Sequence, residues 1–441
     1  MVEGFRSRCI QLGARKGIFV MKTKAVRLYG QQDLRLEAFD LPTIRHDEIL
    51  ARVVTDSVCM SSYKAAIQGP NHKRVPGNIA QHPVIIGHEF CGELLEVGKK
   101  WAGQFKPGDR FSIQPAINDP ANVHAAPGYS FPYIGGAATH VVIPATVMEH
   151  GCLLPFSGAA FYHGSLAEPM SCVVGGFHVN YHTKPGSYAH EMGIKPGGKM
   201  ALLAGAGPMG LGAIDYALHA DRRPSLLVVT DIDDARLARA ASLFTVEQAA
   251  RQGVTLHYVN TMGVDDVPAY LRTFTGDTGY DDAYVYAPVA ALVEQADAIL
   301  GFDGCLNFFA GPTDPAFSAR YNFYNVHYMA THVAGNSGGN TNDMIASLEM
   351  MAAGRIDPSV MVTHIGGLDA VIDTTLRLPK IPGGKKLIYN QISLPLTAIE
   401  DFAELGKADP MFAALARLTR ENKGLWSPAC ERVLLEQAKT I

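Results

Sequence analysis

The sequence lacks the marks of a disulfide scaffold, a membrane protein or a nucleic-acid-binding protein. Its 7 cysteines are odd in number and lack paired spacing, which favours a reducing compartment; they stand at positions 9, 59, 91, 152, 172, 305 and 430. The 38 Lys and Arg against 42 Asp and Glu form no long block of one sign, which argues against nucleic acid or an anionic membrane as a partner. Glycine and proline interrupt the uncharged stretch 200–214, so a membrane helix is not expected there. We therefore expect a cytoplasmic protein whose partners are small molecules.

The 441 residues, 47% of them hydrophobic, are enough for two sizeable globular domains. Residues 1–20 contain no continuous apolar core of signal-peptide length, and we treat them as an N-terminal extension. Short β-rich runs broken by glycine and proline follow over 21–190, and strand and helix patterns alternate over 191–345. Residues 346–441 return to strand and then helix, and we expect them to complete both domains. The predicted fold class is therefore α/β.

A glycine-rich turn stands between a predicted strand, KMALLA, and a predicted helix, LGAIDYAL; it reads Gly205-Ala206-Gly207-Pro208-Met209-Gly210. Gly205 would make the tight turn, Gly207 would let the backbone approach a pyrophosphate, and Gly210 would allow close helix packing. Together with Pro208 and Met209 they are predicted to bind a dinucleotide in a doubly wound, parallel-sheet Rossmann domain. A glycine turn in an unrelated α/β domain is the alternative.

Asp231 ends the next predicted strand, LLVVTD, and is expected to accept hydrogen bonds from the adenosine ribose. A carboxylate there repels a ribose phosphate, so NAD(H) is the favoured coenzyme. Arg222, Arg223 or Arg236 could fold over such a phosphate, which leaves NADP(H) open, and Arg236 is included among the predicted coenzyme-binding residues. A solvated or helix-capping Asp231 is the ordinary alternative.

Three short motifs contain the predicted metal site: Cys59-Met60-Ser61-Ser62-Tyr63, Gly87-His88-Glu89-Phe90-Cys91-Gly92 and Glu168-Pro169-Met170. In these motifs, and in the dinucleotide turn, the chain from about Met21 onward resembles the zinc-containing medium-chain dehydrogenases, and among them the polyol dehydrogenases. The resemblance implies an irregular β-rich GroES-like catalytic domain and a catalytic zinc ion held by Cys59, His88 and Glu168. Zinc accepts thiolate, imidazole and carboxylate donors, and a catalytic site keeps one position free.

Glu89 is a fourth candidate metal ligand. A thiolate, a neutral imidazole and one carboxylate together balance the charge of Zn²⁺, whereas Glu89 would make the site anionic and weaken the metal as a Lewis acid. We therefore expect Glu89 to bind zinc only in some states or to shape the surroundings of the site. Taken singly, each of these residues could also be an ordinary buried side chain.

Residues 112–151 contain no cysteine. Many members of the family hold a structural zinc with four clustered cysteines in this loop. We therefore predict one zinc ion per chain, with the loop held by packing or by a partner subunit. The resemblance also implies a homodimer or a homotetramer.

The resemblance assigns the chemistry to three predicted catalytic residues, Ser61, Glu89 and Glu168. Ser61 matches the hydroxyl that passes a proton to or from the reacting oxygen, and Tyr63 could extend the relay. A turn-capping Ser61 and a packed Tyr63 are the alternatives.

The wider segments EPMSC, MVTHIGGLDA and LPKIPGGKKLIY resemble the L-sorbose 1-phosphate reductase branch of the family. This implies reversible, NAD(P)H-dependent reduction of L-sorbose 1-phosphate to D-glucitol 6-phosphate. A phosphorylated ketose needs a cationic pocket, for which Lys64 or His72-Lys73-Arg74 are candidates, although they could also be a solvated charge cluster.

Two other functions remain open. The first is dehydrogenation of an unphosphorylated polyol or secondary alcohol by the same chemistry. The second is a non-enzymatic dinucleotide-binding protein on the same fold, whose expected mark would be damaged metal positions.

Overall fold

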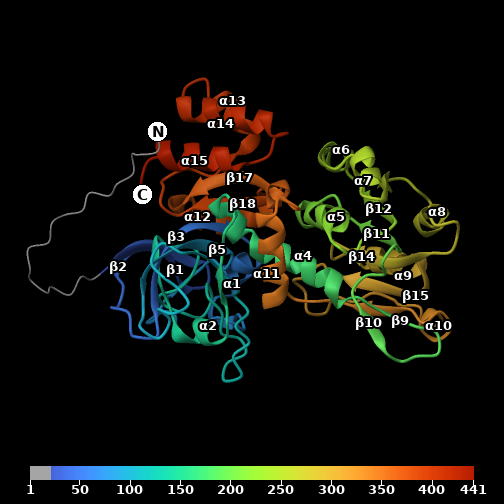
Figure 1. Cartoon of the computed structure of the whole chain (residues 1–441), viewed down its shortest axis with the longest axis horizontal. Coiled ribbons are helices and arrows are strands. Elements are labelled where there is room, and N and C mark those ends of the chain that lie inside the picture. Colours follow the sequence, from blue (N-terminus) through green and yellow to red (C-terminus); the bar gives the residue numbers. More distant parts are fainter. Residues whose placement is uncertain (1–20) are drawn as a thin grey trace, which may run out of the picture.

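The structure is a computed structural model, and it describes residues 21–441. The predicted extension, residues 1–20, lies outside the described residues. Figure 1 shows two lobes, which we name the β-rich lobe (left) and the parallel-sheet lobe (right). Helices α4 (Ala167–Val179) and α11 (Thr341–Ala352) pack against each other between the two lobes.

The parallel-sheet lobe contains a six-stranded sheet whose neighbouring strands are all parallel. In spatial order the strands are β13 (Thr255–Asn260), β12 (Leu226–Asp231), β11 (Lys199–Leu203), β14 (Tyr280–Val285), β15 (Leu300–Phe308) and β16 (His332–Ala334). The helices are α5 (Pro208–His219), α6 (Asp234–Leu243), α7 (Val246–Arg251), α8 (Val267–Thr273), α9 (Ala290–Ile299) and α10 (Phe323–Tyr328). Counted along the chain, this is the 3-2-1-4-5-6 order of a doubly wound Rossmann sheet, which confirms the predicted fold.

Local sequence accounts for these elements. All six residues of β12 are buried, as expected for a parallel strand covered on both faces by helices. Helix α5 begins at Pro208, where the missing N–H costs no helical hydrogen bond. Helix α7 begins with a reciprocal capping box between Thr245 and Gln248.

The β-rich lobe contains an eight-stranded sheet and a three-stranded sheet. The larger follows the path β19-β17-β18-β3-β5-β6-β8, with β7 also paired to β3, and the smaller is ordered β2-β1-β4. The amino-terminal strands are β1 (Lys22–Gly30), β2 (Asp33–Asp40), β3 (Ile49–Val58), β4 (Val84–Ile85), β5 (Phe90–Val97), β6 (Arg110–Ile113), β7 (His140–Ile143) and β8 (Leu153–Pro155). The helices are α1 (Met60–Gln68), α2 (Ala145–Glu149) and α3 (Phe161–Ser165).

The carboxyl-terminal residues add to the β-rich lobe. Strands β17 (Val362–Gly367), β18 (Lys385–Tyr389) and β19 (Thr397–Ala398) extend its large sheet, because β18 pairs antiparallel with β3. Helix α12 (Val371–Arg377) lies between β17 and β18 in the chain, and α13 (Phe402–Leu405), α14 (Pro410–Glu421) and α15 (Pro428–Gln437) cover the sheet at the top of Figure 1. Glu431 on α15 accepts hydrogen bonds from the backbone N–H groups of Phe161 and Tyr162 at 2.6 and 3.0 Å, which ties α15 to the start of α3.

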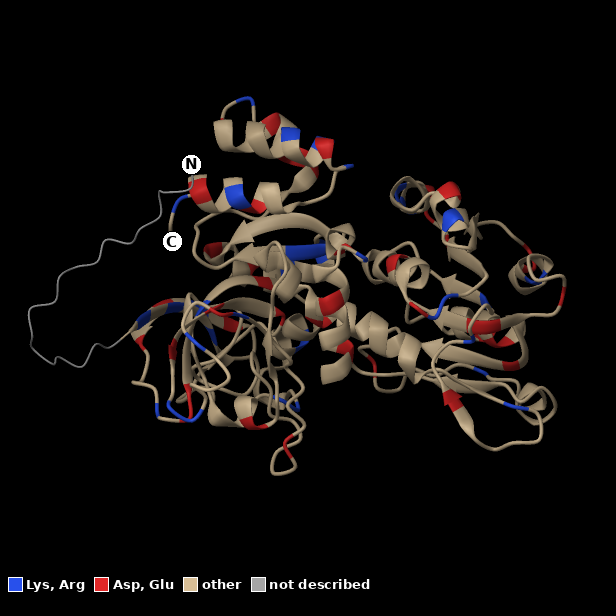
Figure 2. Ribbon diagram, viewed as in Figure 1, with Lys and Arg blue, Asp and Glu red and all other residues tan. Residues whose placement is uncertain are grey.

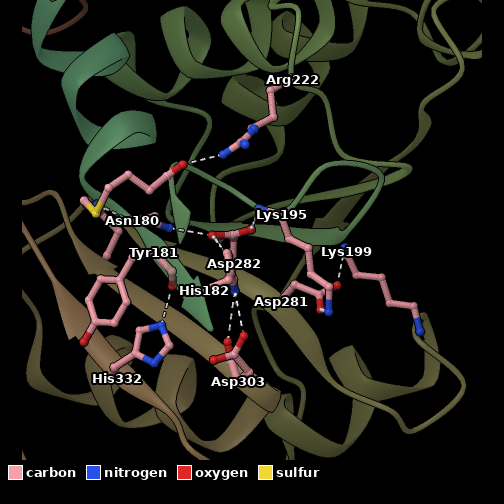
Figure 3. Close-up of polar contacts among 12 residues, drawn as sticks. Asn180, Tyr181, His182, Lys195, Lys199, Arg222, Asp281, Asp282, Asp303 and His332 are labelled. Carbon is pink, nitrogen blue, oxygen red and sulfur yellow. Dashed lines mark hydrogen bonds and ion pairs between the residues drawn. The ribbon is translucent and has the colours of Figure 1, made fainter. Parts of the chain in front are cut away.

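A buried polar network attaches the two-stranded ribbon of β9 (Tyr181–Thr183) and β10 (His190–Met192) to the parallel sheet (Figure 3). The two ring nitrogens of His182 lie 3.0 Å from the Asp303 carbonyl oxygen and 3.3 Å from Asp282 Oδ1. Both nitrogens of His332 also face backbone carbonyl oxygens. His182, Asp303 and His332 lie close enough to share a metal ion, but their polar atoms are already hydrogen bonded within the chain, so we assign them a structural role.

Basic and acidic residues are interspersed along both lobes in Figure 2, without a stretch of one sign. Within residues 21–441, no helix has the length and apolar character needed to cross a bilayer.

Candidate active site

A cavity of about 770 Å³ lies between the two lobes and brings together the predicted metal ligands, Ser61 and one residue of the dinucleotide turn. From the β-rich lobe it is lined by Cys59, Ser61, His88 and Glu89, and from α4 by Glu168. From the parallel-sheet side it is lined by Met209 of the glycine-rich turn and by residues 308–312 and 335–339. The metal motifs and Met209 of the dinucleotide turn therefore line one cavity.

The donor residues occupy the ends of secondary-structure elements. Cys59 directly precedes α1, and Glu168 lies in the first turn of α4. His88 and Glu89 follow Gly87, which has a φ of +90° and whose Cβ would lie 2.3 Å from Asp56 Oδ2. Only glycine fits that turn without strain, so Gly87 sets the direction of the two side chains after it.

Cys59, His88 and Glu89 form the closest donor cluster. Their Sγ, imidazole nitrogen and carboxylate oxygen all lie within 4.8 Å of one another. Glu168 is outside this tight group but approaches the Glu89 carboxyl, and its Oε1 lies 3.9 Å from Cys172 Sγ.

The charges of this cluster test whether a metal ion fits. Burial, together with nearby Glu89, raises the pKa of Cys59 to about 12 and that of Glu168 to about 8. Burial lowers the pKa of His88 to about 4, so its imidazole is neutral at pH 7. Burial disfavours the ionised forms of the Cys59 thiol and the Glu168 carboxyl, and a cation beside them would stabilise those forms. Together with the neutral imidazole of His88, they are a donor set that suits Zn²⁺.

Lys385 is part of the site, although no sequence motif marked it as a functional residue. Its Nζ lies 2.5 and 2.7 Å from the two carboxylate oxygens of Glu89, and the hydroxyl of Ser57 also bonds to Glu89. Burial alone would raise the pKa of Glu89, but the Lys385 ammonium outweighs it and holds the pKa below its usual range. The positive charge of Lys385 therefore offsets the excess negative charge that Glu89 brings to the donor cluster.

Tyr129 is a second residue that sequence reasoning missed. It comes from the loop that lacks the four structural cysteines, and its hydroxyl lies 3.0 Å from His88 Nδ1. Ser62 Oγ lies 3.2 Å from the same nitrogen. The loop is packed through apolar residues such as Ile117 and Ile134, and these two hydroxyls hold the His88 ring.

The predicted relay residues separate. Ser61 Oγ lies 3.8 Å from Cys59 Sγ and lines the cavity, as a proton-transferring hydroxyl would. Tyr63 instead packs against a core cluster of the β-rich lobe, which agrees with its ordinary role as a packed aromatic.

The glycine-rich turn has the close packing that was predicted for it. A Cβ on Gly210 would lie 2.0 Å from the Gly205 carbonyl oxygen, and one on Gly207 would point into open space in front of helix α5. The left-handed residue of the turn is Ala204, with a φ of 53°, which stands just before Gly205. Nothing in the described chain fills the space that Gly207 leaves before the helix N-terminus, where a pyrophosphate fits.

Asp231 ends β12 with one carboxylate oxygen free. Oδ1 accepts hydrogen bonds from the backbone N–H groups of Ile232 and Asp233 at 2.9 and 3.2 Å, whereas the buried Oδ2 has no partner within residues 21–441. A ribose hydroxyl would satisfy that acceptor. Arg236 lies on the exposed first turns of α6, 3.7 Å from Asp233.

Arg222 and Arg223 point elsewhere. Arg222 donates to the Met192 carbonyl oxygen at 2.5 Å, and Arg223 donates to Gln252 at 3.2 Å. Arg236 therefore is the arginine, of the three considered for a ribose phosphate, that lies close to Asp231 in the chain. Its guanidinium lies beside Asp233.

Comparison with known proteins agrees with this geometry. Residues 45–151 match the alcohol dehydrogenase GroES-like domain. The chain is 52% identical over 415 residues to mannitol-1-phosphate 5-dehydrogenase of Aliivibrio fischeri, covering 94% of this chain and 98% of that protein. It is 50% identical over 419 residues to L-sorbose 1-phosphate reductase of Klebsiella pneumoniae, covering 95% of this chain and 98% of that protein.

Among solved structures, 2R,3R-butanediol dehydrogenase from Bacillus subtilis superimposes with a TM-score of 0.66 at 23% identity, covering 83% of this chain and 99% of that chain. This likeness confirms the fold, a GroES-like domain joined to a Rossmann domain. With relatives at 50 and 52% identity over nearly the whole length, the chain belongs to the zinc-containing medium-chain dehydrogenase/reductase family.

Proposed function

We propose that the protein transfers a hydride reversibly between NAD(H) and the carbonyl of a ketose phosphate, with L-sorbose 1-phosphate and D-glucitol 6-phosphate as the specific pair. One observation carries the proposal: a single cavity is lined by the donor cluster, by Met209 of the dinucleotide turn and by the cationic residues Lys64, Lys73 and Arg74. The names of the two relatives at 50 and 52% identity, a ketose phosphate reductase and a hexitol phosphate dehydrogenase, support a phosphorylated substrate.

In this proposal Cys59, His88 and Glu168 hold a catalytic zinc ion, and Glu89 stands beside them. When bound, zinc supplies a Lewis acid that polarises the carbonyl and the nicotinamide supplies the hydride. The chain orients the substrate, and the Ser61 hydroxyl gives a proton to the developing alkoxide or takes one from the alcohol. Lys385 keeps Glu89 ionised and paired, so that its charge does not reduce the electrophilicity of the site.

The coenzyme preference rests on Asp231. Its free Oδ2 suits a ribose hydroxyl and repels a 2′-phosphate. Only Arg236 is placed to offset that repulsion, and it already lies 3.7 Å from Asp233. NAD(H) is therefore the proposed coenzyme.

A dehydrogenase of unphosphorylated polyols uses the same donor cluster and is the second candidate. Initial rates separate the two: the ketoses L-sorbose 1-phosphate, fructose 6-phosphate and sorbose are measured with NADH and NADPH, and sorbitol is measured with NAD+ and NADP+. The proposal expects the highest kcat/KM with NADH and L-sorbose 1-phosphate. Turnover of free sorbitol with no turnover of any sugar phosphate would overturn it.

A further inference from the structure

We propose that Arg74, assisted by Lys73, is the residue that binds the phosphate of the sugar substrate and so selects phosphorylated over free ketoses. This inference rests on the proposed function and assigns the phosphate to a particular part of the cavity. The ligand chemistry is a phosphomonoester dianion on a six-carbon ketose.

Basic side chains without an ion-pair partner in the described chain line one wall of the cavity. Lys64, His72, Lys73 and Arg74 all line the cavity. None of the four forms an ion pair with a carboxylate among residues 21–441. The two acidic residues that line the cavity are Glu89, which is paired with Lys385, and Glu168. Cationic side chains that are not paired with a carboxylate are suited to bind an anion.

The four residues differ in how free their charges are to bind a phosphate. Lys64 Nζ lies 3.4 and 3.5 Å from the carbonyl oxygens of Gly311 and Pro312, so it already bonds across the two lobes. Burial and the neighbouring cations lower the pKa of His72, which makes it a poor anion binder at pH 7. Lys73 is exposed, whereas Arg74 is half-buried, and among residues 21–441 its guanidinium makes no hydrogen bond or ion pair. Arg74 is therefore the strongest candidate.

Contacts within the protein hold Arg74 in place before any ligand binds. Its backbone N–H donates to His72 Nδ1 at 3.3 Å, and its carbonyl accepts from Ser130 Oγ at 2.7 Å. Its Cζ lies 5.4 Å from the centre of the Tyr129 ring, against which His72 also stacks. A guanidinium held over an aromatic ring presents its donors to a phosphate at a low entropic cost.

Arg74 and the donor cluster both lie beside the ring of Tyr129. Tyr129 contacts Arg74 and also His88, where the ring centres are 4.9 Å apart. One aromatic ring therefore separates the phosphate anchor from the donor cluster. A ketose that presents its carbonyl to the cluster can extend along Tyr129 toward Arg74. The two relatives differ in this spacing, because the names imply a phosphate either next to the reacting carbon or at the far end of the sugar.

The test compares Arg74→Gln with Arg74→Lys and with Arg420→Gln, an exposed arginine on α14 outside the cavity. Steady-state rates are measured with L-sorbose 1-phosphate, with fructose 6-phosphate and with free sorbose at raised concentration. Inorganic phosphate serves as a competitive inhibitor. Tryptophan fluorescence on NADH binding and the thermal midpoint check that each variant is folded and binds the coenzyme.

We expect Arg74→Gln to raise KM for the phosphorylated substrate by about 10- to 100-fold, the range of a charge-assisted hydrogen bond, with kcat changed much less. Inhibition by inorganic phosphate should weaken in parallel. The kcat/KM for free sorbose should stay unchanged, Arg74→Lys should recover part of the loss, and Arg420→Gln should match the wild type. The better of the two sugar phosphates identifies which phosphate position the anchor serves.

Two results overturn the inference and leave the proposed function intact. One is an unchanged KM for the sugar phosphate in Arg74→Gln. The other is an equal loss for free and phosphorylated ketoses, which would give Arg74 a structural role. If Arg74→Gln fails to fold, the same comparison is made with Arg74→Lys. If the wild type turns over free polyols alone, the proposed function itself fails, and that outcome is recognised before any variant is measured.

Discussion

Replacing Lys385 by methionine should leave an unpaired negative charge inside the protein. Lys385 Nζ lies 2.5 and 2.7 Å from the carboxylate oxygens of Glu89, whose side chain is 1% exposed. Removing one partner of a buried ion pair costs about 3–5 kcal/mol. Methionine keeps much of the volume of the lysine, so the charge is the main thing lost, and Lys385→Met should lower the free energy of unfolding at pH 8 by about that amount.

The size of this loss should depend on pH. Lys385 is the largest of the influences that lower the pKa of Glu89; without it only His88 and the Ser57 hydroxyl oppose burial, and the pKa should rise above its unfolded value. A carboxyl whose pKa is higher in the folded than in the unfolded protein lowers the free energy of unfolding at every pH at which that carboxyl is ionised in the unfolded chain. The loss should therefore be largest at pH 8 and shrink as the pH falls toward about 4.

Urea unfolding of the wild type and Lys385→Met from pH 5 to 8 measures this, at fixed zinc content because bound metal also stabilises. Glu89→Gln and the double variant complete a thermodynamic cycle. The double variant should recover most of the loss, since it has no buried charge to neutralise. A loss below about 0.5 kcal/mol in Lys385→Met, typical of a surface substitution, would refute the reasoning, as would a double variant no better than the single one.

Three further predictions concern the parallel-sheet lobe. Asp231→Ser should lower kcat/KM for NADH by about 10-fold and leave that for NADPH equal or higher, because a ribose acceptor and a repulsive charge are both lost; a uniform loss would contradict the ribose assignment. Burial lowers the pKa of His182, but Asp282 and Asp303 outweigh it and raise the pKa overall. The stabilisation that protonated His182 gives is therefore complete below about pH 6.5 and is lost as the pH rises through the pKa of His182 in the folded protein. The thermal midpoint of the wild type should fall over that pH range, and the midpoint of His182→Gln should change less. The edge strand β16 and helix α10 expose Val333, Phe323 and Tyr324 at 51, 75 and 66%, and we expect a second copy of the chain to cover them. Val333→Asp should then reduce the mass seen by light scattering, and an unchanged mass would place the interface elsewhere.

Much of the coenzyme lobe is predictable because its signals are local. The strand before Gly205, the helix that begins at Pro208 and the acid at the end of the next strand all lie within one short stretch of chain. Parallel strands buried on both faces are uniformly apolar, as in β12, and this pattern is clear without an alignment.

The remaining parts of the site depend on contacts between distant residues. Lys385 and Glu89 are 296 positions apart, and nothing near either residue indicates that β18 will pair with β3. Tyr129 stands in an irregular loop, where side-chain direction follows from tertiary packing and not from periodicity. The residue types alone indicate that Glu89 adds an excess negative charge to the metal donors. That Lys385 offsets this charge is visible only in the folded structure.

The most direct test of the account is the zinc content and activity of Cys59→Ser beside Cys172→Ser. Both cysteines line the same cavity, but only Cys59 lies within 4.8 Å of the His88 and Glu89 donor atoms as part of the donor cluster. The account predicts one zinc ion per chain and turnover of L-sorbose 1-phosphate in the wild type and in Cys172→Ser, and loss of both in Cys59→Ser. A Cys59→Ser protein that keeps its zinc and its full rate would contradict it.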